Sequence, residues 1–91
     1  MNEPMLAELS ALSDLLIAVA QRDEAALALL YDALGAAVHG QALRLTGDAA
    51  AADALTEATF WRVWREAPRF DPQQGPAVAW VLSLAEPEAP R

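Results

Sequence analysis

The carboxylates of Asp53 and Glu57 are four residues apart, so on a helix they would lie side by side on one face. A carboxylate pair can ligate a metal ion, but the chain has no cysteine and His39 is its single histidine. We therefore expect a solvated acidic face and no metal site. His39 falls near the apolar side of a helical pattern, which favours a partly buried histidine with a hydrogen-bond partner.

Other residues that could do chemistry are sparse. Three scattered serines and one histidine do not support a Ser-His-Asp arrangement. A phosphate-binding loop of the Gly-x-x-x-x-Gly-Lys type is excluded because the sequence contains no lysine. We therefore expect a protein that is not an enzyme and has no cofactor.

Three of the six arginines, Arg62, Arg65 and Arg69, fall within eight positions. They could contact phosphates, but the net charge of −7 opposes a broad electrostatic footprint on nucleic acid. Three phosphate contacts would give a salt dependence of only about one to two decades in affinity between roughly 50 and 200 mM salt. Any binding to DNA is therefore expected to be weak without a partner.

The composition predicts one small helical domain. Ninety-one residues with 22 alanines and few β-branched residues favour an all-α fold. The first residues lack the basic segment of a signal peptide, and no charge-free apolar run reaches the roughly 20 residues that cross a bilayer. We therefore expect a cytoplasmic protein that does not enter a membrane.

Helical periodicity places four helices. The first is expected over residues 5–20, with a plausible new start near Ser13-Asp14. Asp23 is expected to cap a second helix, whose apolar face would contain Leu27, Leu30, Tyr31, Leu34, Val38, Ala42 and Leu45. Two glycines inside this pattern, Gly35 and Gly40, are interpreted as points of close contact between helices.

The third helix is the one most suited to function. It is expected to begin at the cap Asp48, to run to about Ala67 and to end at Pro68, and a fourth should span residues 76–85. The third helix has an acidic first half, then aromatic residues and arginines near its end. Trp64 is expected in the core, whereas core and surface positions stay open for Trp61 and Trp80.

Three segments resemble bacterial sigma factors of the extracytoplasmic-function type. Residues 14–32 resemble the opening of these proteins. Gly47-Asp48 through Trp64-Arg65 resembles their region 2.2, in which Glu-Asp-Leu-Thr-Gln-Glu-Val-Phe-Leu-Arg-Val-Trp-Arg is typical. Residues 69–85, Arg-Phe-Asp-Pro-Gln-Gln-Gly-Pro-Ala-Val-Ala-Trp-Val-Leu-Ser-Leu-Ala, resemble region 2.3. The three matches occur in the family's order and spacing.

The resemblance implies a small three- to four-helix bundle of the sigma factor region 2 type over residues 14–85. Residues 1–13 would be a partly helical N-terminal extension, and residues 86–91 a disordered tail. Relative to the family pattern, Ala54 and Ala58 stand where acidic residues are usual, and Glu57 replaces Gln. A basic helix, region 2.4, usually follows Ala85, so we expect a truncated region 2.

The resemblance also implies partners. The third helix would dock on the β′ clamp helices of RNA polymerase core, and an anti-sigma protein is a further implied partner. The loop and helix that follow would help to recognise and open promoter DNA at the −10 element. The polymerase contacts would be Asp53, Leu55, Thr56, Glu57 and Trp61, and the DNA contacts Arg62, Arg65, Arg69 and Trp80. The alternative is a helical interaction module that does not initiate transcription, such as a decoy for an anti-sigma protein or the clamp, or a remnant.

Overall fold

The structure is a computed structural model that describes residues 3–87, with side-chain placement from Ser10 onward. Its elements are α1 (Glu3–Ala20), α2 (Glu24–Thr46), α3 (Ala49–Glu66), the short 3-10 helix η1 (Ala67–Arg69) and α4 (Ala77–Ser83). The described residues contain no strand. The predicted all-α fold with three to four helices is therefore confirmed.

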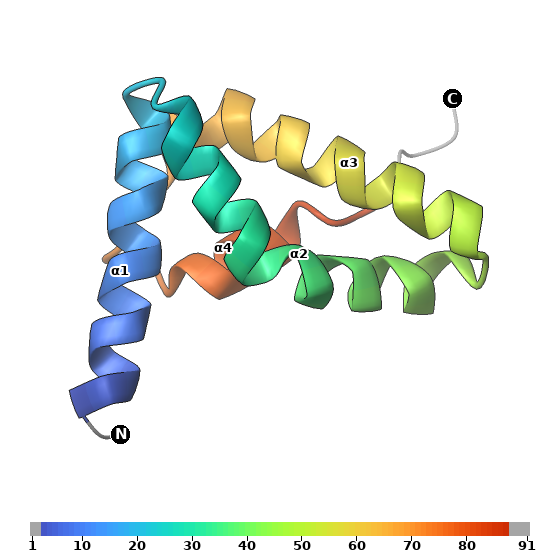
Figure 1. Ribbon diagram of the computed structural model, residues 1–91, viewed down its shortest axis with the longest axis horizontal. Helices are drawn as coiled ribbons and strands as arrows, with labels where there is room; N and C mark the ends of the chain where they lie inside the picture. Colours follow the sequence, from blue (N-terminus) through green and yellow to red (C-terminus); the bar gives the residue numbers. More distant parts are fainter. Residues whose placement is uncertain (1–2, 88–91) are drawn as a thin grey trace.

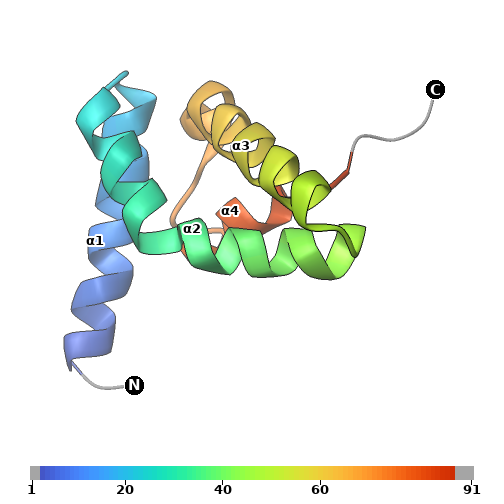
Figure 2. The same ribbon diagram turned by 45° about the vertical axis from the view of Figure 1, so that its right-hand side comes forward.

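Helix α2 is the centre of the packing. The second half of α2 and helix α3 run antiparallel and are joined by a short turn, while α1 stands across the other end of the pair (Figure 1). In a view turned by 45°, α4 lies behind α2, between α1 and the turn (Figure 2). Helix α2 contacts α1, α3 and α4, and its most extensive contact is with α3. The α2–α3 pair is therefore the frame that positions any site on α3.

Both predicted helix caps are present. The Asp23 carboxylate accepts a hydrogen bond from the backbone N–H of Ala26 at 3.1 Å, and Asp48 accepts one from Ala51 at 2.8 Å. Between the two helices, Gly47 adopts a left-handed conformation with φ of 66°. Its N–H closes α2 on the carbonyl of Leu43, which is the usual way to end a helix at a glycine.

The core combines one face of each helix. Its fully buried members are small or medium aliphatic side chains: Leu16, Val19, Leu30, Val38, Val63 and Val81. A second, smaller cluster of Ala42, Ala52 and Leu55 closes the far end of the α2–α3 pair. Tyr31 and Leu45, which were predicted on the buried face of α2, are instead about half exposed (51% and 50%). Tyr31 lies at the flank of that face, where its ring packs on Phe60 of α3 and is only partly covered.

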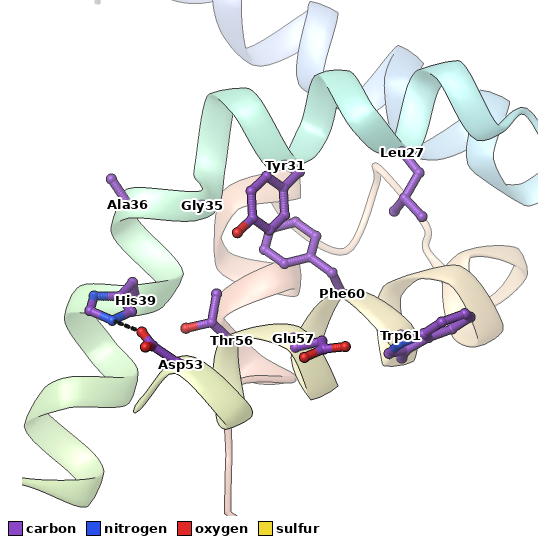
Figure 3. A pocket seen from close by; sticks show the side chains of 10 residues that line it. All are labelled: Leu27, Tyr31, Gly35, Ala36, His39, Asp53, Thr56, Glu57, Phe60 and Trp61. Atoms are coloured by element: carbon purple, nitrogen blue, oxygen red, sulfur yellow. Dashed lines mark hydrogen bonds and ion pairs between the residues drawn. The ribbon is translucent and has the colours of Figure 1, made fainter. Parts of the chain in front are cut away.

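Two predictions about helix interiors are wrong. Helix α1 passes through Ser13-Asp14 without a new start. A side chain at Gly35 or Gly40 would meet only atoms of the same helix, the Tyr31 ring or the Arg44 guanidinium, at 3.7 Å or more. Neither glycine marks a contact between helices. Instead, α2 changes direction between Gly35 and His39 (Figure 3).

Replacing Gly40 by alanine is expected to raise the free energy of unfolding by about 0.5–1 kcal/mol, because alanine is the better helix former and the added methyl group has room. The measurement is urea denaturation followed by circular dichroism. Gly47→Ala is the control, and it should destabilise by about 1–2 kcal/mol because Gly47 has a positive φ. A loss of stability in Gly40→Ala would contradict the open surroundings found for Gly40.

Among the described helices, α2 alone is long and apolar enough to cross a membrane by length and composition. One face of this helix packs against α1, α3 and α4. The proposed boundary between residues 13 and 14 lies inside the continuous α1. Of the predicted disordered tail, Glu86 and Pro87 follow α4 without helical structure, and residues 88–91 lie outside the described residues.

Candidate interaction site

Three side chains of α3 form a continuous exposed row. Asp53, Glu57 and Trp61 are spaced by four residues, which places them one above another on the helix surface. All three are exposed, and Trp61 has 62% of its surface accessible. The buried side chains Thr59 and Val63 anchor α3 to the bundle and hold the row outward. We call Asp53, Glu57 and Trp61 the α3 row.

Leu55 and Thr56, which were predicted to contact the same partner, lie beneath the α3 row. Their exposed fractions are 8% and 5%, and the Thr56 hydroxyl donates to the carbonyl of Ala52 at 2.8 Å. Both side chains therefore pack inside the domain and offer little surface. Their contact with a partner stays a prediction, as does that of Asp53, Glu57 and Trp61, whose side chains are accessible.

A groove of about 740 Å³ runs between α2 and α3 beside the row. Tyr31 and Phe60 lie at its centre, with ring centroids 4.9 Å apart and ring planes tilted by 57° (Figure 3). The residues that line it are Leu27, Tyr31, Gly35, Ala36, His39, Asp53, Thr56, Glu57, Phe60 and Trp61. We call it the α2–α3 groove. It was not predicted, because it depends on how two helices face each other.

A polar bridge closes one end of the α2–α3 groove. Nε2 of His39 donates to Oδ1 of Asp53 at 2.9 Å, and the two side chains are 40% and 75% exposed (Figure 3). The prediction of a partly buried, hydrogen-bonded His39 is therefore confirmed. Glu57 makes no ion pair with any other side chain that the structure describes. Its carboxylate is thus the accessible negative charge at the middle of the α3 row.

Arg62 has a structural task in the fold. Its guanidinium, partly buried, donates to the carbonyls of Leu84 at 2.8 Å and Glu86 at 2.6 Å, beyond the end of α4. Nearby, the side-chain amide of Gln41 donates to the carbonyls of Leu82 and Ala85 at 2.8 and 3.1 Å. Gln41 on α2 and Arg62 on α3 therefore bond backbone carbonyls at and beyond the end of α4, which a helix end leaves without partners. The predicted DNA contact of Arg62 is untested, and its Nη1 already donates both of the bonds to Leu84 and Glu86.

The other predicted DNA contacts lie at the end of α3 and on α4. Arg65 and Arg69 are exposed, and Arg69 lies 3.6 Å from the carboxylate of Glu66. Trp80 is half-buried and packs edge-on against Phe70, with ring centroids 5.6 Å apart. Arg65 lies on α3 as Arg62 does, Arg69 on η1 and Trp80 on α4. Two exposed arginines, of which Arg69 is paired with Glu66, and one partly covered tryptophan remain as accessible groups.

The three tryptophans differ in their surroundings. Trp64 packs against the core, and the guanidinium carbon of Arg22 lies 5.1 Å from the centroid of its ring. Trp61, in contrast, is mostly exposed to solvent. Arg22 also donates to the carbonyl of Trp64, which ties the α1–α2 turn to α3. Neither this pairing nor the bonds of Gln41 could be predicted from the sequence, because the partners are more than 40 residues apart. Trp64 is thus structural and Trp61 is available for binding.

Trp64→Ala is expected to lower the free energy of unfolding by about 2–3 kcal/mol, since core contacts and the cation–π contact with Arg22 are lost. Trp61→Ala should change it by less than about 0.5 kcal/mol because that side chain is mostly in water. Paired thermal unfolding curves measure both. Equal losses in the two variants would contradict the assigned surroundings.

The described surface shows no metal cluster but has a distinct acidic and aromatic region. Among the described residues, no group of three histidine, cysteine, aspartate or glutamate side chains could hold a metal ion. What the surface does present is an acidic and aromatic row beside a groove, with two exposed arginines at the end of α3. These features belong to a small all-helical domain with an accessible acidic and aromatic surface.

Comparison with known proteins identifies its class. The Sigma-70 region 2 family matches residues 30–89, which is well over half of the chain, so the chain belongs to this family of non-enzymatic transcription regulators. The chain is 41% identical over 78 residues to the ECF RNA polymerase sigma factor SigK of Mycolicibacterium vanbaalenii, covering 86% of this chain and 40% of that protein. It is 38% identical over 80 residues to SigK of Mycobacterium tuberculosis (strain CDC 1551 / Oshkosh), covering 88% and 43%.

The chain thus spans about two fifths of the length of the curated relatives it matches. The resemblance to extracytoplasmic-function sigma factors is confirmed at the level of region 2. The match begins at Leu30, inside α2, and includes α3, η1 and α4. The α3 row, the arginines near the end of α3 and every residue that lines the α2–α3 groove except Leu27 therefore lie within the matched region.

Proposed function

We propose that this domain binds RNA polymerase core through the α3 row, with the β′ clamp helices as the docking element. The observation that carries the proposal is the exposure of the α3 row, Asp53, Glu57 and Trp61, on a helix whose opposite side packs in the core. The domain acts by binding, without catalysis or a cofactor, and it acts in the cytoplasm, where polymerase works.

Charge and burial both support this role. The net charge of −7 favours a basic partner, and two carboxylates on one helix face give that attraction a defined location. An exposed tryptophan is among the side chains that contribute most when an interface covers them. Because the carboxylates are exposed, salt should screen the attraction and weaken the complex.

We further propose that the bound domain takes part in recognition and melting of the −10 element. Arg65 and Arg69 are exposed and can contact phosphates, while Trp80 has an accessible part that can stack on an unpaired base. Two arginines provide few phosphate contacts. Polymerase must therefore hold the DNA, and the domain alone should bind it weakly.

The test begins with a labelled chain and purified polymerase core. The chain has no cysteine, so Ala11→Cys on the exposed side of α1 gives a single labelling position away from the α3 row. We expect a saturable rise in fluorescence anisotropy with core, weakened by added salt. No rise at micromolar core would contradict the proposal.

Run-off transcription then separates initiation from docking. Transcripts from a promoter with a −10 element would support the melting role. Binding to core without transcripts would favour the alternative of a non-initiating module that occupies the clamp. Capture of a purified anti-sigma protein, without binding to core, would favour the decoy for that protein.

A further inference from the structure

Helix α4 has few interactions of its own that hold its ends. It contains seven residues, its cap residue Pro76 makes no side-chain hydrogen bond, and there is no acidic residue in its first turn and no basic residue in its last turn. Isolated helices shorter than about 12 residues are marginal in water. The position of α4 therefore depends on its contacts with α1 and α2 (Figure 2).

The side-chain amide of Gln41, on α2, bonds the end of α4 directly. Its Nε2 donates to the carbonyl of Leu82 at 2.8 Å and to the carbonyl of Ala85 at 3.1 Å. The two protons of an amide nitrogen allow both bonds at once. The opposite orientation of the amide would set Oε1 against two carbonyl oxygens, which only accept, so the nitrogen must face α4. Gln41 thus ties the last turn of α4 and the chain just beyond it to α2.

These bonds lie close to Trp80 along the chain. Trp80 precedes Leu82 by two residues, and its half-buried ring packs edge-on against Phe70, with ring centroids 5.6 Å apart. The buried side chains Ala77 and Val81 hold one face of α4 in the core, but apolar contacts have no preferred direction. Hydrogen bonds fix both distance and angle. Without the bonds of Gln41, α4 would keep its packing and lose the contacts that set its orientation.

We infer that Gln41 is a positioning residue for the DNA contact of Trp80. By holding the end of α4, it sets the direction in which the indole faces an unpaired base. Stacking requires the two rings to overlap, so a displaced indole stacks poorly. The inference rests on the proposed role in melting of the −10 element. It adds to that role a side chain of α2 that acts through α4 and lies outside the α3 row and the α2–α3 groove.

The first test follows the position of Trp80 in the free chain. With 5-fluorotryptophan at all three tryptophan positions, ¹⁹F NMR separates the side chains, and Trp80→Phe assigns the signal of Trp80. Gln41→Leu keeps a side chain of similar size but removes the donor, and it should shift or broaden this signal while that of Trp61 stays unchanged. Gln21→Leu is the control because Gln21 is exposed, and it should change neither signal. An unchanged Trp80 signal in folded Gln41→Leu would overturn the inference.

The second test measures stacking in the complex of the full chain with polymerase core. The probe is a short single-stranded DNA of alternating thymine and adenine, with 2-aminopurine in place of one adenine, whose fluorescence falls when the base stacks. Gln41→Leu should weaken binding of this probe about fivefold or more, which is the scale of one lost base–aromatic stack. Its affinity for core should change less than about twofold, since Gln41 is not part of the α3 row.

A double variant separates positioning from a general loss of stability. If Gln41 only stabilised the fold, Gln41→Leu would weaken probe binding equally with and without Trp80, and the two effects would add. Positioning predicts that Gln41→Leu costs less than about twofold in a Trp80→Ala background. Additive losses would overturn the inference and leave the melting role intact. A complex of the unmodified chain that does not bind the probe would overturn both.

A third measurement needs no substitution. The side-chain amide protons of Gln41 should exchange with solvent at least about tenfold more slowly than those of Gln73 and Gln74, which are exposed. Exchange is followed by NMR of the free chain. Equal exchange at the three glutamines would overturn the inference even if Gln41→Leu fails to fold.

Discussion

Replacing Asp53 and Glu57 together by lysine should weaken binding to polymerase core by at least about a hundredfold, since two attractive contacts become repulsive. The substitution also places a cation beside His39, where Asp53 now accepts a hydrogen bond. Both positions are exposed, so the cost to folding should stay below about 1 kcal/mol. Anisotropy titrations at two salt concentrations measure the loss.

The matched control is Asp14→Lys with Asp32→Lys. These two aspartates are also exposed, they lie on α1 and α2 outside the α2–α3 groove, and their replacement changes the net charge by the same amount. If general attraction to a basic partner caused the binding, both double variants would lose affinity equally. A loss confined to the Asp53 and Glu57 variant would show that binding depends on their position.

Arg62→Ala should lower the free energy of unfolding by about 2–3 kcal/mol, because the carbonyls of Leu84 and Glu86 lose a charged donor. In a domain of this size that corresponds to a fall in melting temperature of roughly 10–20 °C. Thermal unfolding by circular dichroism provides the measurement. The loss is large because these bonds hold the chain after α4 against α3.

Arg65→Ala is the control for Arg62→Ala, since Arg65 lies on the same helix but is exposed. Its removal should change the free energy of unfolding by less than about 0.5 kcal/mol. Similar unfolding curves for the two variants would contradict the structural task assigned to Arg62. That result would leave the predicted DNA contact as the remaining role for Arg62.

Local features of the fold were predictable because they depend on residues close in sequence. Asp23 and Asp48 each bond to an amide three residues away, so their capping could be inferred from residue type and position. The turn at Asp71 is similar, since its carboxylate accepts from the N–H of Gln73. The α3 row was predictable for the same reason, because a spacing of four fixes one helix face.

Features that join distant segments were not predictable from periodicity. The bonds of Arg62 and Gln41 to the end of α4 span between 22 and 44 residues. From the sequence alone, Arg62 near the end of α3 is indistinguishable from an unpaired surface charge. Tyr31 shows the opposite case, since its spacing matches the core face although its ring lies at the edge and forms the groove.

The most direct test of the docking face is photo-cross-linking from position 61. A benzoylphenylalanine in place of Trp61 keeps an aromatic group on the exposed row, and the same replacement of Leu29 samples the α2 surface outside the groove. In the complex with polymerase core, position 61 should cross-link to the β′ subunit and position 29 should not. Cross-links to β′ from position 29 alone would place the contact elsewhere and contradict the proposed docking face.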